Sequence, residues 1–199
     1  MKADLRWSQT EGKLNRATIQ LLRQQPLAKL TVTALTQTAK VSRKAFYLHY
    51  PDMDSFVKAQ ENLIISQFKA VIETSHQTFK AKLNDPALVQ QQSFTVLKQV
   101  LQVVNHHRSL IGALLSDNGD PRFKHQLNAL LNDEISRRIK LYQAHLTSRI
   151  PRRYAMEILV SGLSNLIVSW VNNPHPESVD HFAQILTTSR LIAPLDLLN

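Results

Sequence analysis

The sequence predicts an all-α protein with a small three-helix domain at residues 1–52 and a larger helical domain at residues 53–199. Apolar residues recur at spacings of three and four along most of the chain, and no alternating strand pattern interrupts them. Two very short helical segments near the start are joined by a tight turn. Helices this short cannot bury a core alone, so we expect them to present side chains.

The first helix is predicted over residues 9–24. Ser8 and Glu11 have the spacing of a capping box, and Pro26 ends the helix. Its apolar side is formed by Leu14, Ala17, Ile19, Leu21 and Leu22.

The next two helices are predicted within residues 31–49. Thr31 is the expected N-cap of the first and Ser42 that of the second. Lys40–Val41 makes the turn, and Pro51 cannot continue the second helix. A scaffold helix followed by a presented helix is a helix-turn-helix, which places side chains in the major groove of DNA.

The presented helix carries side chains that suit DNA. Arg43 and Lys44 can reach base edges or phosphates, and Tyr47 and His49 can donate to phosphate oxygens. Each of them alone is better explained as a solvated or half-buried residue, but the whole combination favours DNA binding. The predicted DNA-binding residues are Thr31, Thr33, Ser42, Arg43, Lys44, Ala45, Tyr47, Leu48 and His49.

The charge of the chain is uneven. Residues 1–53 hold 9 Lys/Arg and 3 Asp/Glu, which is +6 of a formal net charge of +9. A basic N-terminal part is typical of a domain that binds a polyanion. Charge alone leaves solubility as the other explanation.

The stretch Val41–Asp52 resembles the DNA-binding signature of the TetR (tetracycline-repressor) family of bacterial transcription regulators. The resemblance covers residues 8–56. Two positions depart from the family pattern. Lys40 replaces the usual turn glycine, which predicts either a strained positive φ at this residue or a slightly different turn. Met53 replaces a lysine that often meets a phosphate.

This resemblance implies a DNA-binding helix-turn-helix domain at residues 1–52 and a ligand-binding and dimerisation domain at residues 53–199. It implies a homodimeric, sequence-specific transcriptional regulator on a palindromic operator, a repressor released by a small-molecule effector. The C-terminal half resembles the branch that regulates dihydroxyacetone kinase operons. Some members of that branch activate, so the sign of regulation stays open.

The second domain is expected to contain helices near residues 53–82, 87–106, 109–115, 122–145, 151–172 and 176–191, with a loop at 116–121. The helix at 151–172 is apolar nearly all round, so most of its sides must be buried. We expect a second copy to cover it across a two-fold axis. The predicted dimer interface is Leu159, Leu163, Leu166, Ile167, Trp170, Phe182 and Leu186.

A ligand pocket between helices is weakly indicated. The candidate lining residues are Phe68, Phe94, Tyr142 and Trp170, which could equally be plain core. Ser161, Asn165 and Ser169 form a polar stripe that could line the pocket, pair across a dimer or face outward.

Other functions find little support. The chain has no cysteine and only 4 glycines, so it offers no thiolate site or phosphate loop. His106 and His107 are adjacent on a helix and face different directions, so they are poorly placed to bind one metal ion. No catalytic motif is readable. The start lacks an apolar leader, and the tract Ile158–Val171 is too short and polar for a membrane span.

We therefore expect a cytoplasmic protein that is not an enzyme, with no metal, cofactor or membrane partner. Its expected partners are double-stranded DNA, a second copy of the chain and an unknown small-molecule effector. The alternative is a helical protein-interaction module or co-regulator that does not itself read DNA, which Lys40 and Met53 support. The operator, the effector and the regulated genes are not readable from the sequence.

Overall fold

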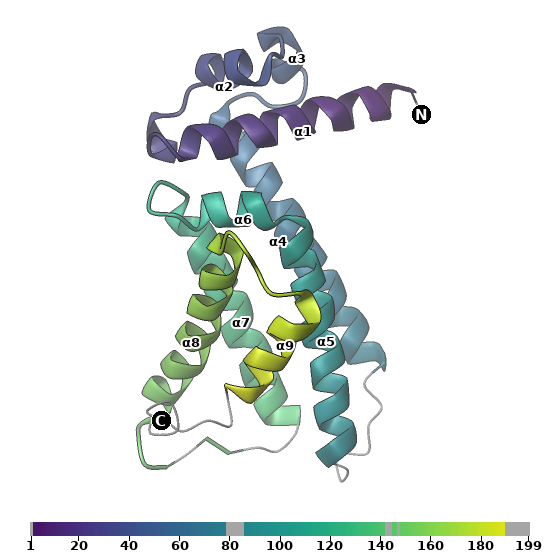
Figure 1. Ribbon diagram of the computed structural model, residues 1–199, viewed down its shortest axis with the longest axis vertical. Helices are drawn as coiled ribbons and strands as arrows, with labels where there is room; N and C mark the ends of the chain where they lie inside the picture. Colours follow the sequence, from purple (N-terminus) through teal and green to yellow (C-terminus); the bar gives the residue numbers. More distant parts are fainter. Residues whose placement is uncertain (1, 79–85, 142–144, 147, 190–199) are drawn as a thin grey trace. The chain divides into compact units, whose positions relative to one another are not determined.

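The computed structural model describes residues 2–78, 86–141, 145–146 and 148–189 (Figure 1). The described residues are helical and contain no strand, so the all-α prediction is confirmed. The elements are α1 (Lys2–Leu22), the 3-10 helix η1 (Leu27–Lys29), α2 (Val32–Ala39), α3 (Arg43–Tyr47), α4 (Met53–Thr78), α5 (Pro86–His106), α6 (Arg108–Leu114), α7 (Pro121–Leu141), α8 (Arg152–Asn172) and α9 (Val179–Thr188).

The chain divides into two compact units. Unit 1 contains Met1–Ile65 and His107–Lys124, and unit 2 contains Ser66–His106 and His125–Asn199. The boundary predicted after residue 52 falls between α3 and α4, inside unit 1. It stays a prediction as a division between DNA binding and regulation.

The first helix begins earlier than the sequence predicts. Ser8 lies inside α1, so the predicted capping box is wrong. The residues before Ser8 include no proline or glycine, and a helix continues through a serine at a small cost in propensity. The helix ends at Leu22, where the N–H groups of Gln24 and Gln25 both donate to the carbonyl of Leu21.

The turn between α2 and α3 has the strain that the sequence predicts. Lys40 has φ 54° and ψ 47°, the left-handed region that glycine adopts most readily. Its N–H donates to Gln37 O at 3.1 Å, and the N–H of Val41 donates to Thr36 O at 3.0 Å. These bonds satisfy carbonyls at the end of α2, which stabilises the turn against the strain.

The core of unit 1 joins α1, α2, α3, α6, the first part of α4 and the start of α7. Leu14, Leu35, Phe46, Phe56, Ile64, Ile111, Leu114 and Phe123 are all at most 1% exposed. The predicted loop before α7 is confirmed, and Asn118 fixes it within this unit. Asn118 O accepts from the N–H of Leu27 at 2.8 Å, and its amide donates to Leu22 O at 2.9 Å.

A buried carboxyl pair joins α4 to the same loop. Glu61 and Asp120 are 1% and 3% exposed and hydrogen-bond to each other. Arg122 donates to Asp120 Oδ2 at 2.7 Å and to Asp54 Oδ1 at 2.8 Å. The hydrogen bond from Arg122 lowers the pKa of Asp120. The pKa of Glu61 is raised to about 7, mainly by burial and secondly by the negative charge of Asp120. Glu61 is therefore the acid that donates, and Asp120 the carboxylate that accepts.

Unit 2 has its core between α5, α8 and α9. The Trp170 ring stacks on Phe182 with centroids 4.5 Å apart, and its Nε1 donates to Glu177 O at 3.0 Å. Lys98 of α5 forms an ion pair with Asp180 of α9 at 2.5 Å. One side of α8 stays exposed: Tyr154, Ile158, Gly162, Asn165 and Ser169. The polar stripe thus faces outward at Asn165 and Ser169, while Ser161 donates to Glu157 Oε1 at 2.7 Å.

Helix α8 contains the apolar tract Ile158–Val171. The helix begins at Arg152 and has 21 residues, with a mean hydropathy of 1.4 in its most apolar window. Length and composition alone are weak evidence for a membrane span. A core helix of a soluble protein passes the same test, and a third of this window is buried (33%).

The carboxyl pair predicts a pH-dependent stability. Because the pKa of Glu61 lies near 7 in the folded chain, above its ordinary 4.5, its protonated form contributes stability below pH 4.5 that is lost as the pH rises through 7. Glu61→Gln imitates the protonated form. It should raise the free energy of unfolding by roughly 2–3 kcal/mol at pH 9 and by little at pH 4.5. Urea unfolding at pH 4.5, 7 and 9 measures this difference, with the exposed Glu157→Gln as control. Parallel pH curves for Glu61→Gln and the unsubstituted chain would contradict it.

The left-handed turn predicts a second effect on stability. Lys40→Gly should raise the free energy of unfolding by about 0.5–1 kcal/mol, because glycine adopts a positive φ without strain. Lys40→Ala removes the same charge and keeps the strain, so it should give no such gain. The urea midpoints of the two variants are the measurement. Equal midpoints would show that φ at this position is not a source of strain.

Candidate nucleic-acid interface

Helix α2 is held by short-range bonds that the sequence encodes. Thr31 Oγ1 accepts from the N–H of Ala34 at 3.1 Å, which confirms it as the N-cap. Thr36 Oγ1 donates to Val32 O at 2.8 Å, so this buried hydroxyl is satisfied within the helix. Leu35 is fully buried, so the side of α2 that carries it packs against the core of unit 1.

Helix α3 is capped as predicted but is shorter. Ser42 Oγ accepts from the N–H of Ala45 at 3.1 Å. The helix ends at Tyr47, and Leu48 is the C-cap, so the predicted end at His49 is two residues too late. Proline at 51 excludes helical geometry in the residue before it, and the chain leaves the helix ahead of that point.

One side chain anchors α3 to the core. Phe46 is 0% exposed and lies against Tyr50 and Phe56, with ring centroids 5.7 and 5.9 Å apart. The edge of Tyr47 meets the Phe46 ring at 5.6 Å. With this residue turned inward, the rest of the helix faces outward.

The exposed face of the motif contains the predicted DNA-binding residues. Ala45 is half-buried, and the others are exposed: Thr31, Thr33, Ser42, Arg43, Lys44, Tyr47, Leu48 and His49. Leu48 is 72% exposed and Tyr47 is 47% exposed, which is unusual for large apolar side chains. The guanidinium of Arg43 lies 5.9 Å from the Tyr47 ring centroid. Cations and aromatic edges on one short helix can bind phosphates and base edges.

A polar network fixes the segment after α3. Tyr50 OH donates to Glu11 Oε1 at 2.8 Å, and Gln60 Nε2 donates to the same oxygen at 3.0 Å. Asn15 Nδ2 donates to Gln60 Oε1 at 2.9 Å. Burial raises the pKa of Tyr50 well above its ordinary value, and the hydrogen bond to Glu11 raises it further. Tyr50 therefore stays a neutral donor that ties α1 and α4 to the end of α3.

The sequence prediction missed a second contact at this end. Trp7 of α1 stacks on His49, with ring centroids 3.3 Å apart and an interplanar angle of 15°. Its ring also lies 5.7 Å from that of Tyr50. The predicted first helix began at residue 9, which left Trp7 outside it. Extending the predicted helix by two residues would have included Trp7 and placed it on the same face as Glu11 and Asn15.

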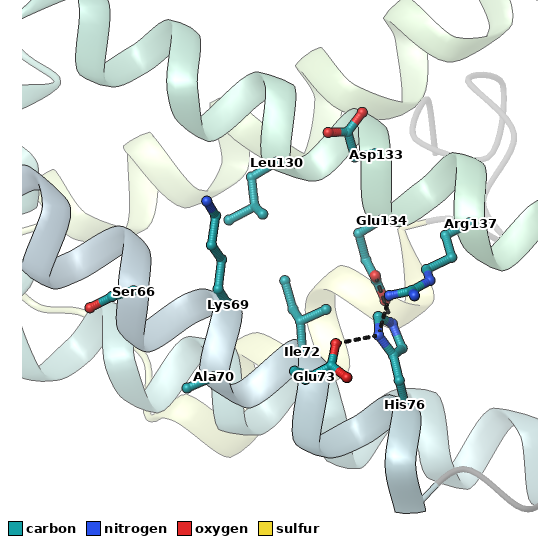
Figure 2. Close-up of a pocket in the computed structure, with 10 residues that line it drawn as sticks. All are labelled: Ser66, Lys69, Ala70, Ile72, Glu73, His76, Leu130, Asp133, Glu134 and Arg137. Atoms are coloured by element: carbon teal, nitrogen blue, oxygen red, sulfur yellow. Dashed lines mark hydrogen bonds and ion pairs between the residues drawn. The ribbon is translucent and has the colours of Figure 1, made fainter.

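Unit 2 contains an open cleft of about 680 Å³ between α4 and α7 (Figure 2). It is lined by Ser66, Lys69, Ala70, Ile72, Glu73, His76, Leu130, Asp133, Glu134 and Arg137. In the described part of the chain, no group of three or more acidic, histidine or cysteine side chains could hold a metal ion. The lining of the cleft combines positively and negatively charged side chains with apolar ones such as Ile72 and Leu130.

His76 is the best-connected side chain of the cleft (Figure 2). Its Nδ1 accepts from Arg137, because a guanidinium can only donate. The other ring nitrogen, Nε2, lies 3.0 Å from Glu134 Oε2 and so donates to it. Glu134 also accepts from Arg138 Nε at 2.6 Å. This network joins α4 to α7 within unit 2.

The residues predicted for a ligand pocket do not line this cleft. Phe68 is 4% exposed and Trp170 is 2% exposed, so both lie in the core. Phe94 is half-buried on α5, and Tyr142 lies outside the described residues. The sequence identified apolar aromatic residues, whereas five of the ten residues that line this cleft are charged.

The residues predicted for a dimer interface lie deeper than expected. Trp170, Phe182 and Leu186 are buried within one chain. Leu159, Leu163, Leu166 and Ile167 are half-buried. A side chain that is buried within one chain cannot contact a second copy directly. In a dimer, these three residues would only hold α8 and α9 in place from within. Their assignment to an interface stays a prediction.

Two family models match the chain. Residues 14–59 match "Bacterial regulatory proteins, tetR family", and residues 91–190 match "Transcriptional regulator C-terminal region" of the TetR type. No curated protein matches the chain.

Solved structures share the fold. A TetR transcriptional regulator from Streptococcus agalactiae 2603V is 21% identical, with 95% of this chain and 97% of that chain covered and a TM-score of 0.56. The fatty acid degradation regulator FadR from Bacillus halodurans is 10% identical, with 90% and 93% covered and a TM-score of 0.55. The resemblance to the dihydroxyacetone kinase branch finds no support among these. The C-terminal family model alone spans half of the chain, and with the helix-turn-helix match it shows that this protein is a DNA-binding transcriptional regulator of the TetR family.

Proposed function

We propose that the chain acts as a homodimer that reads a palindromic DNA site with α3 of each copy. One observation carries this proposal: α3 is anchored by the single buried residue Phe46 and turns Arg43, Lys44 and Tyr47 to solvent. A two-fold dimer places two such helices on half-sites about one helical turn apart, roughly 34–36 Å.

The residues of the motif have separate roles in this proposal. Arg43 and Lys44 lie in the first turn of α3 and read base edges. Tyr47 and His49 donate to phosphates and set the register, and Thr31 and Thr33 contact the backbone beside them. Such a protein works where the chromosome is, so we place it in the cytoplasm.

The exposed face of α8 supports the dimer. Tyr154 and Ile158 are 51% and 64% exposed on a helix whose sequence is otherwise that of a core. Gly162, on the same face, has no atom within 4 Å of the place where a Cβ would stand. A bare backbone beside apolar side chains lets another helix approach closely. We propose that this face meets the same face of a second copy.

Regulation by a ligand is the remaining part of the proposal. The cleft between α4 and α7 lies within the size range of small-molecule sites. Helix α4 begins directly after the DNA-reading segment and continues into unit 2. A small polar effector that separates α4 from α7 would favour a different position of α4, and so weaken DNA binding. If the protein is a repressor, such an effector releases the genes that it silences.

Arg43 provides the first test of the proposal. A duplex selected by the unsubstituted protein from a random pool serves as its operator. Arg43→Ala should cost roughly 1–3 kcal/mol on this operator and much less on an unrelated duplex, because a lost bidentate base contact matters only at the right base. Tyr47→Phe is the matched control, since a lost phosphate contact weakens both duplexes alike. Gel shift measures both. Absence of any shift by the unsubstituted protein would favour the interaction module that does not read DNA.

Ile158 provides the test of the dimer. Ile158→Glu places a charge on an exposed position, so the single chain should keep its fold while the dimer separates. Sedimentation at micromolar concentration should then show a mass near 22.7 kDa in place of twice that value. DNA affinity should fall at the same time, because one copy holds only one half-site. Gln102→Glu on α5 adds the same charge at an exposed position and should leave the dimer intact. A monomeric unsubstituted protein would contradict the dimer and the palindrome together.

A further inference from the structure

His49 lies just beyond α3, where the helix no longer orients it. Its N–H donates to Phe46 O at 3.0 Å, which fixes the backbone but not the ring. The side chain is exposed, and an exposed imidazole outside a helix can turn about two bonds. The contact that orients the ring is the stack with Trp7.

We infer that Trp7 is a positioning residue for DNA binding, which holds the His49 ring with its edge toward a DNA phosphate. The inference rests on the proposed function, in which His49 binds the DNA backbone. Trp7 itself needs no contact with DNA for this role.

The geometry of the stack supports this role. Ring planes only 15° apart mean that the indole covers a face of the imidazole. The hydrogen bonds of an imidazole lie in its ring plane, at the edge that carries both nitrogens. A partner on the face therefore restricts the ring without occupying the groups that a phosphate needs.

The surroundings make Trp7 a rigid support. Its ring is half-buried and lies 5.7 Å from that of Tyr50, which is held by Glu11 and Gln60. An oriented side chain loses less conformational entropy when it binds, so affinity rises without a new contact. The long α1 thereby contributes to DNA binding from outside the helix-turn-helix.

A purely structural role is the competing explanation. Trp7 could simply fill space beside Tyr50, and its loss would then weaken the whole domain. The two roles differ in one respect: positioning acts only through His49, whereas loss of packing acts whether or not His49 is present. A double-mutant cycle separates them.

The experiment uses the full-length protein and one fixed duplex, with affinity measured by fluorescence anisotropy. Trp7→Leu keeps an apolar side chain but removes the flat ring, and it should lower affinity about 3- to 10-fold for each copy that touches DNA. Trp7→Phe keeps an aromatic face and should stay within about 2-fold of the unsubstituted protein. In a His49→Ala background, Trp7→Leu should change affinity by less than about 2-fold.

Two controls keep the outcomes distinct. Ile19→Ala removes apolar packing from the same helix and should weaken binding equally with and without His49. Thermal unfolding of every variant shows that the compared proteins are folded. An equal loss from Trp7→Leu in both backgrounds, or no loss in either, would overturn the inference and leave the proposed function intact. Failure of the unsubstituted protein to bind any duplex would overturn both.

Discussion

A helix of five residues has almost no stability of its own, so the proposed DNA-binding surface depends on how the rest of unit 1 holds α3 in shape. The burial of Phe46 is the central contact. The Phe46 ring packs against Tyr50 and Phe56. The other residues of α3 are exposed or half-buried. The Ser42 cap fixes where the helix starts, and the Tyr50–Glu11 bond fixes the chain just after it ends. A short helix held at both ends can present side chains with little loss of conformational entropy on binding.

The features that the sequence predicted are those decided within a few residues. Thr31 and Ser42 cap their helices because a hydroxyl reaches an N–H three residues on, wherever the helix lies in the fold. The left-handed Lys40 was predictable from the resemblance, since the family has glycine there. The predicted DNA-binding residues of α3 are at the surface for a similarly local reason, because one inward Phe46 determines the direction of its neighbours.

The features that the sequence could not provide depend on contacts between distant residues. Glu61 and Asp120 are ordinary acidic residues in the sequence, and only the packing of the loop against α4 buries Glu61 and raises its pKa to about 7. The cleft between α4 and α7 was not predicted: Phe68 and Trp170, two of the ligand-pocket candidates, lie in the core, and five of the ten residues that line the cleft are charged. From the sequence alone, charged residues are assigned to solvent. The ligand-pocket candidates themselves stay a prediction. The direction of α8 was equally hidden, since an all-round apolar helix does not reveal which side is covered.

The two tryptophans have a practical consequence. The chain contains 2 of them, Trp7 in unit 1 and Trp170 in unit 2. Trp170 is 2% exposed and stacked on a phenylalanine, whereas Trp7 is half-buried beside a histidine. Their emission should differ in colour and in sensitivity to aqueous quenchers, so a single fluorescence spectrum contains one optical signal from each unit. Replacing either indole with phenylalanine would let the melting of unit 1 and of unit 2 be followed separately in the same intact protein.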